Sequence, residues 1–337
     1  MKSRERIEVD GFEPYANRYE KIDELNKNSF LINEGSSLQV LQSLHSAGAP
    51  RDMLSEKYAD TFDLQVVEKA QNISRVALAG NMSPLNGYGP MYLTPEERIE
   101  DAKNNINAFL AQNDISSEHV RILRPERDYT TPLSIVNLED APLSPDDTGL
   151  LRPNQAGDMI YTHDPEVILV ARPADCPIVF LSAETPAGTI TVLLHLAWLG
   201  VAHGYIQQAK KELDKLQIDW LTAQVQITPG GHADTYLFEN FSKFNPLEEF
   251  PESASMFVNF REFKDDEGGS SFSFGLDVAA EVYEQITDTW GVDQHNVYAD
   301  TSDTTAPESG YSSHSRSFKN YAVHGENSRD LVLARRL

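Results

Sequence analysis

The segment from Met159 to His195 constrains the fold more than any other part of the chain. It contains four short runs rich in apolar and β-branched residues, separated by turn residues: MIYT, VILVA, CPIVFL and TITVLLH. Runs of this length and composition are typical of β-strands. The last two are joined by a short turn segment and should form a hairpin. Both faces of this hairpin are apolar, which predicts a position in the middle of a sheet.

The hairpin brings together the lone cysteine and a histidine. If residues 184–187 form a four-residue loop, Cys176 faces His195, with Cβ atoms roughly 5 Å apart. A neighbouring thiol and imidazole can bind a metal such as zinc or copper, or can act as an activated nucleophile. The alternative is structural: Cys176 is a small core residue and His195 a hydrogen-bonded strand end. The residue pair alone does not choose between these interpretations.

Three amphipathic helices are expected around the strands. Thr94, Pro95 and Glu97 supply an N-cap, a first-turn proline and a capping-box acid for the first helix. The apolar spacing predicts the other two over about residues 202–216 and 277–290. Strands followed by helices in this pattern indicate an α+β fold.

Two other regions of the chain have a less regular apolar pattern. Residues 1–75 are polar and weakly patterned, with one short helix expected over Ser37 to Ser46. We interpret residues 1–75 as an N-terminal extension of unknown role and residues 76–337 as the main domain. The interval from Asn245 to Ser273 contains the run DDEGGSS and is interpreted as an irregular excursion.

Charge and composition exclude several kinds of partner. Asp and Glu total 52 against 28 Lys and Arg, a formal charge of -24, so a nucleic acid or an anionic membrane would be repelled. The longest apolar region, Ile190 to Ala202, is too short to cross a bilayer, and we expect no membrane partner. A single cysteine fits a reducing compartment, which predicts a cytoplasmic protein. The sequence does not indicate the oligomeric state.

Several motifs resemble those of one protein family. PADCP resembles the family's ADCxP motif and HLAWLG its HAGWRG motif, at the usual separation. GDMIYT is similar to the ADALVT strand, TPGGHADTYLFE to GPxIGxCCYEV, and YSSHSRSFKNYAVHGENSRD to FFSYRR followed by TGR. On these motifs the chain is identified as a divergent member of the laccase-domain family, described as polyphenol oxidases and purine nucleoside phosphorylases. The resemblance implies mixed, largely antiparallel β-sheets packed together with outer helices, a fold related to cysteine hydrolases.

The resemblance also implies a site. In the family, a cysteine and two histidines hold a metal beside a purine nucleoside pocket. Carried over, the ligands of a zinc or copper ion are Cys176, His195 and Glu126, where a carboxylate stands in for a histidine. The remaining implied site residues are Asp175 as support for the metal shell, Arg316 and Arg329 facing the substrate anion, and His232 and Tyr236 at the nucleoside.

The expected function is that of a metal-dependent enzyme acting on purine nucleosides. It would cleave adenosine, inosine or guanosine with phosphate or water, or deaminate adenosine. Leu199 replaces the arginine of HAGWRG, the natural partner of phosphate, which argues against phosphate-dependent cleavage. One alternative is a catalytically silent nucleoside-binding or scaffold protein; another is a cysteine hydrolase using Cys176 and His195. A multicopper polyphenol oxidase would need clustered histidines, whereas the 9 present here are scattered.

Overall fold

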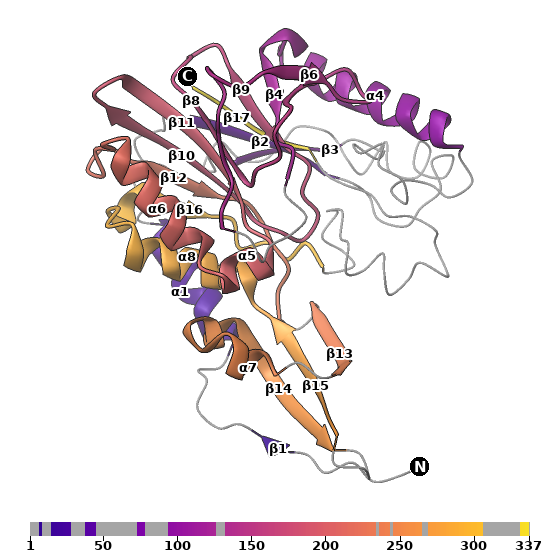
Figure 1. Cartoon of the computed structure of the whole chain (residues 1–337), viewed down its shortest axis with the longest axis vertical. Helices are drawn as coiled ribbons and strands as arrows, with labels where there is room; N and C mark the ends of the chain where they lie inside the picture. Colours follow the sequence, from indigo (N-terminus) through magenta and orange to yellow (C-terminus); the bar gives the residue numbers. More distant parts are fainter. Residues whose placement is uncertain are drawn as a thin grey trace.

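The computed structural model describes residues 7–8, 15–27, 38–44, 73–77, 94–125, 132–233, 236–242, 245–264, 269–305 and 331–336. These residues form three β-sheets and a set of helices (Figure 1). The helices are α1 (Tyr15–Lys27), α4 (Pro95–Gln112), α5 (Trp198–Ala202), α6 (Tyr205–Lys215), α7 (Pro246–Glu249) and α8 (Val278–Thr289), with short 3-10 turns η1 (Ser117–His119), η2 (Pro251–Met256) and η3 (Gln294–Asn296).

A six-stranded sheet lies at the centre of the molecule. Its strand order is β16 (Val297–Ala299), β12 (Gln224–Ile227), β10 (Ile178–Thr185), β11 (Gly188–His195), β8 (Met159–Thr162) and β5 (Ile135–Asn137). The four inner strands pair antiparallel, while the two edge strands pair parallel to their neighbours. The hairpin of β10 and β11 therefore occupies the middle of the sheet, which confirms the expectation from its two apolar faces.

A seven-stranded sheet packs on one face of the central sheet. Its strand order is β3 (Ile73–Ala77), β2 (Leu38–Leu44), β17 (Val332–Arg336), β9 (Ile168–Ala171), β4 (Val120–Ile122), β7 (Leu151–Pro153) and β6 (Leu143–Pro145). Ile178, Phe180 and Leu193 of the hairpin pack into a shared core with residues of β2, β9 and β17. The two sheets thus form the sandwich at the heart of the fold.

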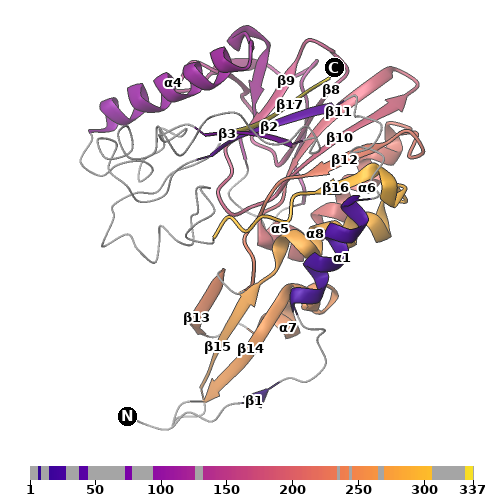
Figure 2. The same ribbon diagram turned by 180° about the vertical axis from the view of Figure 1, so that it is seen from behind.

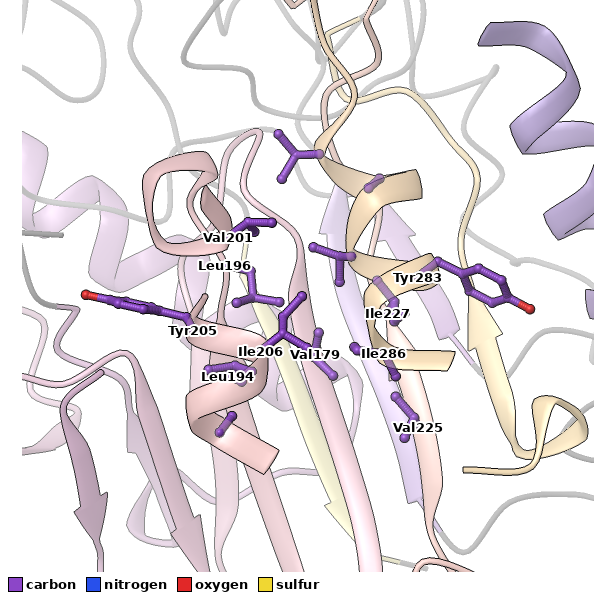
Figure 3. Close-up of a cluster of buried hydrophobic side chains, with 14 of the residues drawn as sticks. Val179, Leu194, Leu196, Val201, Tyr205, Ile206, Val225, Ile227, Tyr283 and Ile286 are labelled. Atoms are coloured by element: carbon purple, nitrogen blue, oxygen red, sulfur yellow. The ribbon is translucent and has the colours of Figure 1, made fainter. Parts of the chain in front are cut away.

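Helices cover the outer faces of the six-stranded and the seven-stranded sheet. Val179 and Leu194, on the other face of the hairpin, pack against Ile206 of α6 and Ile286 of α8 (Figure 3). On the far side of the seven-stranded sheet, Phe109 of α4 packs in a third core cluster with residues of β4, β9 and β17. In the two views, α4 lies on the opposite side of the sheets from α6 and α8 (Figure 1, Figure 2). The chain has the expected α+β architecture of packed mixed sheets with outer helices.

The three expected helices are confirmed. α4 begins with the capping box: Glu97 N donates to Thr94 Oγ1 at 3.2 Å, and Thr94 N donates to Glu97 Oε2 at 2.7 Å. Helices α6 and α8 fall within the two ranges predicted from apolar spacing. None of the described helices is long and apolar enough to cross a membrane.

Two expectations about irregular regions were wrong. Residues 38–44 form strand β2 rather than a helix, because they pair antiparallel with β17 and parallel with β3. This pairing buries Leu38 and Val40 and outweighs any local helical preference. The supposed excursion after Asn245 contains strands, not only loop: β14 (Phe257–Lys264) and β15 (Ser270–Leu276) pair with β1 (Ile7–Glu8) and β13 (Leu237–Ser242) in a four-stranded sheet that projects from the body (Figure 1).

The hairpin register also differs from the expectation. Thr185 faces Gly188 across a two-residue loop, and Ile178, not Cys176, faces His195. Thr185 Oγ1 accepts from Ala187 N at 3.1 Å and donates to Gly188 O at 2.8 Å, and Gly188 has a φ of +111°, so the ladder continues further than expected. The error is a shift of two residues, which keeps every side chain on its predicted face.

Segments of the first 75 residues contact the main body. Helix α1 packs against α8 and the end of β16, and strand β2 lies inside the seven-stranded sheet. Asn26 of α1 binds the backbone of Ala299 in both directions, with Nδ2 donating to its O at 2.6 Å and Oδ1 accepting from its N at 3.2 Å. The domain boundary at residue 75 stays a prediction.

Candidate active site

Two strand ends bring Cys176 and His195 together. Cys176 lies two residues before β10 begins, and His195 is the last residue of β11, so both sit at the same edge of the central sheet. The backbones meet here as well, since Leu196 N donates to Pro177 O at 3.1 Å. The side chains of His195 and Cys176 are hydrogen-bonded to each other. Cys176 is half-buried, and the His195 side chain is only 12% exposed.

Asp158 holds the other side of the imidazole. It directly precedes β8, which pairs with β11, and its side chain is completely buried. Asp158 Oδ1 lies 2.8 Å from His195 Nδ1, and its backbone O accepts from His195 N at 2.7 Å. A carboxylate can only accept, so Nδ1 carries the proton. Nε2 is then the ring atom that can interact with a thiol or a metal ion.

The electrostatics of the centre favour a positive charge on His195. Burial alone would lower the pKa of the imidazole. Hydrogen bonds to Asp158 and Cys176, with the favourable electrostatic environment of these two neighbours, outweigh burial and raise the pKa of His195 from 6.5 to about 10. Asp158 Oδ2 is buried and has no hydrogen-bond partner among the described residues. A second proton on His195, or a metal ion bound to its Nε2, would supply positive charge beside this buried carboxylate.

The structure ties Asp175 to a neighbouring loop. Asp175 is 1% exposed, and its Oδ1 accepts from Thr304 Oγ1 at 3.1 Å. Its backbone O accepts from Gly231 N at 3.0 Å. Gly230 also lies close to the Cys176 segment. A Cβ added at Gly230 would be 3.3 Å from Asp175 O and 3.3 Å from Pro177 Cδ. The loop of Pro229 to His232 is therefore packed directly against the segment that carries Cys176.

His232 and Tyr236 belong to this same loop region. The His232 ring stacks on Tyr19 of α1, with centroids 3.8 Å apart and an interplanar angle of 22°. His232 N donates to Asp303 Oδ1 at 3.1 Å, and His232 O accepts from Tyr236 N at 2.7 Å. Tyr236 is buried over Gly231, where a Cβ would lie 2.6 Å from Tyr236 Cδ1.

Only some of the residues implied to hold a metal lie in the part of the chain that the structure describes. Glu126, Arg316 and Arg329 lie outside the described residues. Within the part of the chain that the structure describes, no group of three or more His, Cys, Asp or Glu residues is arranged to hold a metal ion. Cys176 and His195 do lie together, and a thiolate with an imidazole suits zinc or copper. The described residues thus fit two ligands of the implied metal.

Sequence reasoning did not single out Asp158. Its signal was present in the motif GDMIYT, where an aspartate stands immediately before an apolar strand. A carboxylate at a strand end beside a histidine-bearing strand is a candidate orienting group. The pairing of β8 with β11, which brings Asp158 to His195, was not part of the expectation.

Comparison with known proteins agrees with this fold. The family model described as multi-copper polyphenol oxidoreductase laccase matches residues 97–325, more than half of the chain. The chain belongs to this family, the laccase-domain family. None of the curated proteins is significantly similar to it in sequence.

Two solved structures share the fold at low sequence identity. YlmD from Geobacillus stearothermophilus is 17% identical, with a TM-score of 0.52 over 76% of this chain and 84% of that chain. The hypothetical protein YfiH from Bacillus licheniformis is 15% identical, with a TM-score of 0.50 over 71% of this chain and 82% of that chain. At this identity the likeness concerns the fold alone.

Proposed function

We propose that this protein is an enzyme that acts on purine nucleosides at the centre formed by Cys176, His195 and Asp158. The observation that carries the proposal is the hydrogen-bonded chain from the thiol through the imidazole to a fully buried carboxylate. Membership of the laccase-domain family supports it. The substrate is a small-molecule nucleoside, and the lone cysteine supports a cytoplasmic location.

The proposed cofactor is zinc, with copper as the alternative, held by Cys176 and His195 and by Glu126 as third ligand. Bound there, the metal would lower the pKa of a water molecule and polarise the substrate. Asp158 fixes the ring orientation and tautomer of His195, so that Nε2 is directed to the ligand position. Asp175 supports the segment before Cys176 through Gly231 and Thr304.

The proposed substrate contacts lie on either side of this centre. His232 and Tyr236 would meet the base, since their loop packs beside the Cys176 segment. Arg316 and Arg329 are the proposed partners of a substrate anion. Leu199 offers no charge where an arginine would bind phosphate, which favours water over phosphate as the attacking group.

The second candidate is a cysteine hydrolase. The same hydrogen-bonded chain has the connectivity of a nucleophile, a general base and an orienting acid. In that case the proton shared between Cys176 and His195 Nε2 passes to the leaving group as the Cys176 sulfur attacks the substrate. The two candidates differ in the loss of kcat that they predict for replacement of Asp158.

Turnover assays test the proposed function. Wild-type protein is expected to convert adenosine or inosine without added phosphate, releasing either the free base or ammonia, and phosphate should change the rate little. His195→Ala should abolish the conversion because it removes both a ligand and the partner of Cys176. His119→Ala is the matched control, since His119 lies in η1 at the surface beside Glu118. Absence of turnover in the wild type, or equal turnover in His195→Ala, would contradict the proposal.

A further inference from the structure

Helix α1 contacts the loop beside the candidate site through one aromatic ring. Tyr19 is buried, and its ring lies flat against the His232 imidazole at 3.8 Å. Its hydroxyl donates to Asp277 Oδ1 at 2.5 Å. The ring thus contacts the loop through the stack on His232, while the hydroxyl bonds to the residue before α8 and not to the loop.

The rest of α1 is held firmly enough to keep that ring in place. Arg18 Nη1 donates to Asp277 Oδ2 at 2.9 Å, and Arg18 Nη2 donates to Glu281 Oε2 at 3.1 Å. About two turns further along the helix, Asn26 makes its two hydrogen bonds to the backbone of Ala299. Because residues seven apart lie on the same face of a helix, Tyr19 and Asn26 dock the same face of α1.

The contact continues from His232 to the segment that carries the thiol. Gly231, next to His232, donates to the backbone O of Asp175 at 3.0 Å, and Asp175 precedes Cys176. His232 itself is also held through its backbone by Asp303. The loop that carries the His232 ring is thus joined to Asp303 on one side and to the Asp175 backbone on the other.

We propose that Tyr19 is a positioning residue of the candidate site: its ring fixes the loop of Pro229 to His232 against Asp175 and Cys176. The N-terminal helix then belongs to the working site rather than being a separate appendage. The inference rests on the proposed function for its effect on turnover, but its effect on the loop is measurable without any substrate. The group of Tyr19 that holds the loop is, in this inference, the stacked ring rather than the hydroxyl.

Amide hydrogen exchange of the full chain tests the inference. Tyr19→Leu should exchange about threefold to tenfold faster at residues 230–233 than the wild type, the range expected for loss of one aromatic pair. Tyr19→Phe keeps the ring and should remain near the wild type. Asn26→Ala, the matched control, weakens the same face of α1 without touching His232 and should leave exchange at residues 230–233 unchanged. In the nucleoside assay, Tyr19→Leu should raise KM more than it lowers kcat.

Two results would overturn the inference. One is exchange at residues 230–233 in Tyr19→Leu that equals the wild type. The other is an equal acceleration in Asn26→Ala, which would mean that the loop responds to general loosening of α1. If the wild type turns over no nucleoside, the proposed function fails while the exchange results still decide the role of Tyr19.

Discussion

Replacement of Arg18 by methionine is expected to lower the free energy of unfolding by about 3–5 kcal/mol, the range for breaking a buried ion pair from one side. Arg18 is 8% exposed and pairs with Asp277 at 2.9 Å, with Glu281 at 3.1 Å and with the more exposed Glu284 at 2.6 Å. Methionine fills much of the same volume but leaves the buried carboxylates without this counterion. Urea denaturation measures the change as a lower midpoint at an unchanged slope.

The loss should depend on pH. Burial raises the pKa of Asp277 to about 6, although Arg18 and the Tyr19 hydroxyl act to lower it. Without Arg18 this pKa rises further. A folded-state pKa above the unfolded value of 3.8 stabilises the folded state at low pH, and this contribution is lost as the pH rises through the folded-state pKa. The difference between the wild type and Arg18→Met should therefore be smaller at about pH 5 than at about pH 8.

An exposed ion pair provides the control for this variant. Lys210 pairs with Asp214 four residues later on the surface of α6. Replacement of Lys210 by methionine should lower the free energy of unfolding by only about 0.3–0.5 kcal/mol. A loss for Arg18→Met as small as this, or one that is independent of pH, would mean that the buried cluster does not hold α1 in place.

Replacement of Asp158 by asparagine is expected to lower kcat for the nucleoside by about 10- to 100-fold, as for other groups that orient a metal-binding histidine. Asparagine has nearly the same shape. Its amide oxygen can accept from His195 Nδ1, but it lacks the negative charge of Asp158, and its NH2 group cannot accept from Nδ1. The same change in a cysteine hydrolase would favour the wrong tautomer of the general base, with a loss nearer to about 10⁴-fold.

Steady-state kinetics therefore separates the two candidate functions. Melting temperatures recorded beside the kinetics show whether the Asp158→Asn variant is folded. An unchanged kcat in a folded variant would remove Asp158 from both mechanisms, since each one requires it to orient His195.

The central strands could be predicted from the sequence because their apolar pattern is regular. The hairpin and its buried position followed from apolar residues on both faces. The register did not, because a period-two pattern is unchanged by a shift of two residues, and only the contacts of Thr185 in the loop decide between the alternatives. The same periodicity explains why Cys176 and His195 still meet although neither their pairing nor the loop length was right.

Contacts between distant segments could not be predicted. Asp158 reaches His195 because β8 joins the hairpin, and no local pattern specifies that neighbour. Helix α1 docks through Arg18 and Tyr19 on Asp277, which precedes α8 and lies more than two hundred positions away in the sequence. The polar sequence of α1 alone therefore gave no sign of a buried face. Strand β2 was mistaken for a helix for the same reason, since its partner β17 lies at the other end of the chain.

The most direct test of the account is the metal content of tag-free protein, measured by mass spectrometry on the wild type and on Cys176→Ala. The account predicts about one zinc or copper ion per wild-type chain, and its loss in the variant, because the thiolate is one of the ligands. A wild type without bound metal, or a variant that binds the same amount, would contradict a metal centre at Cys176 and His195.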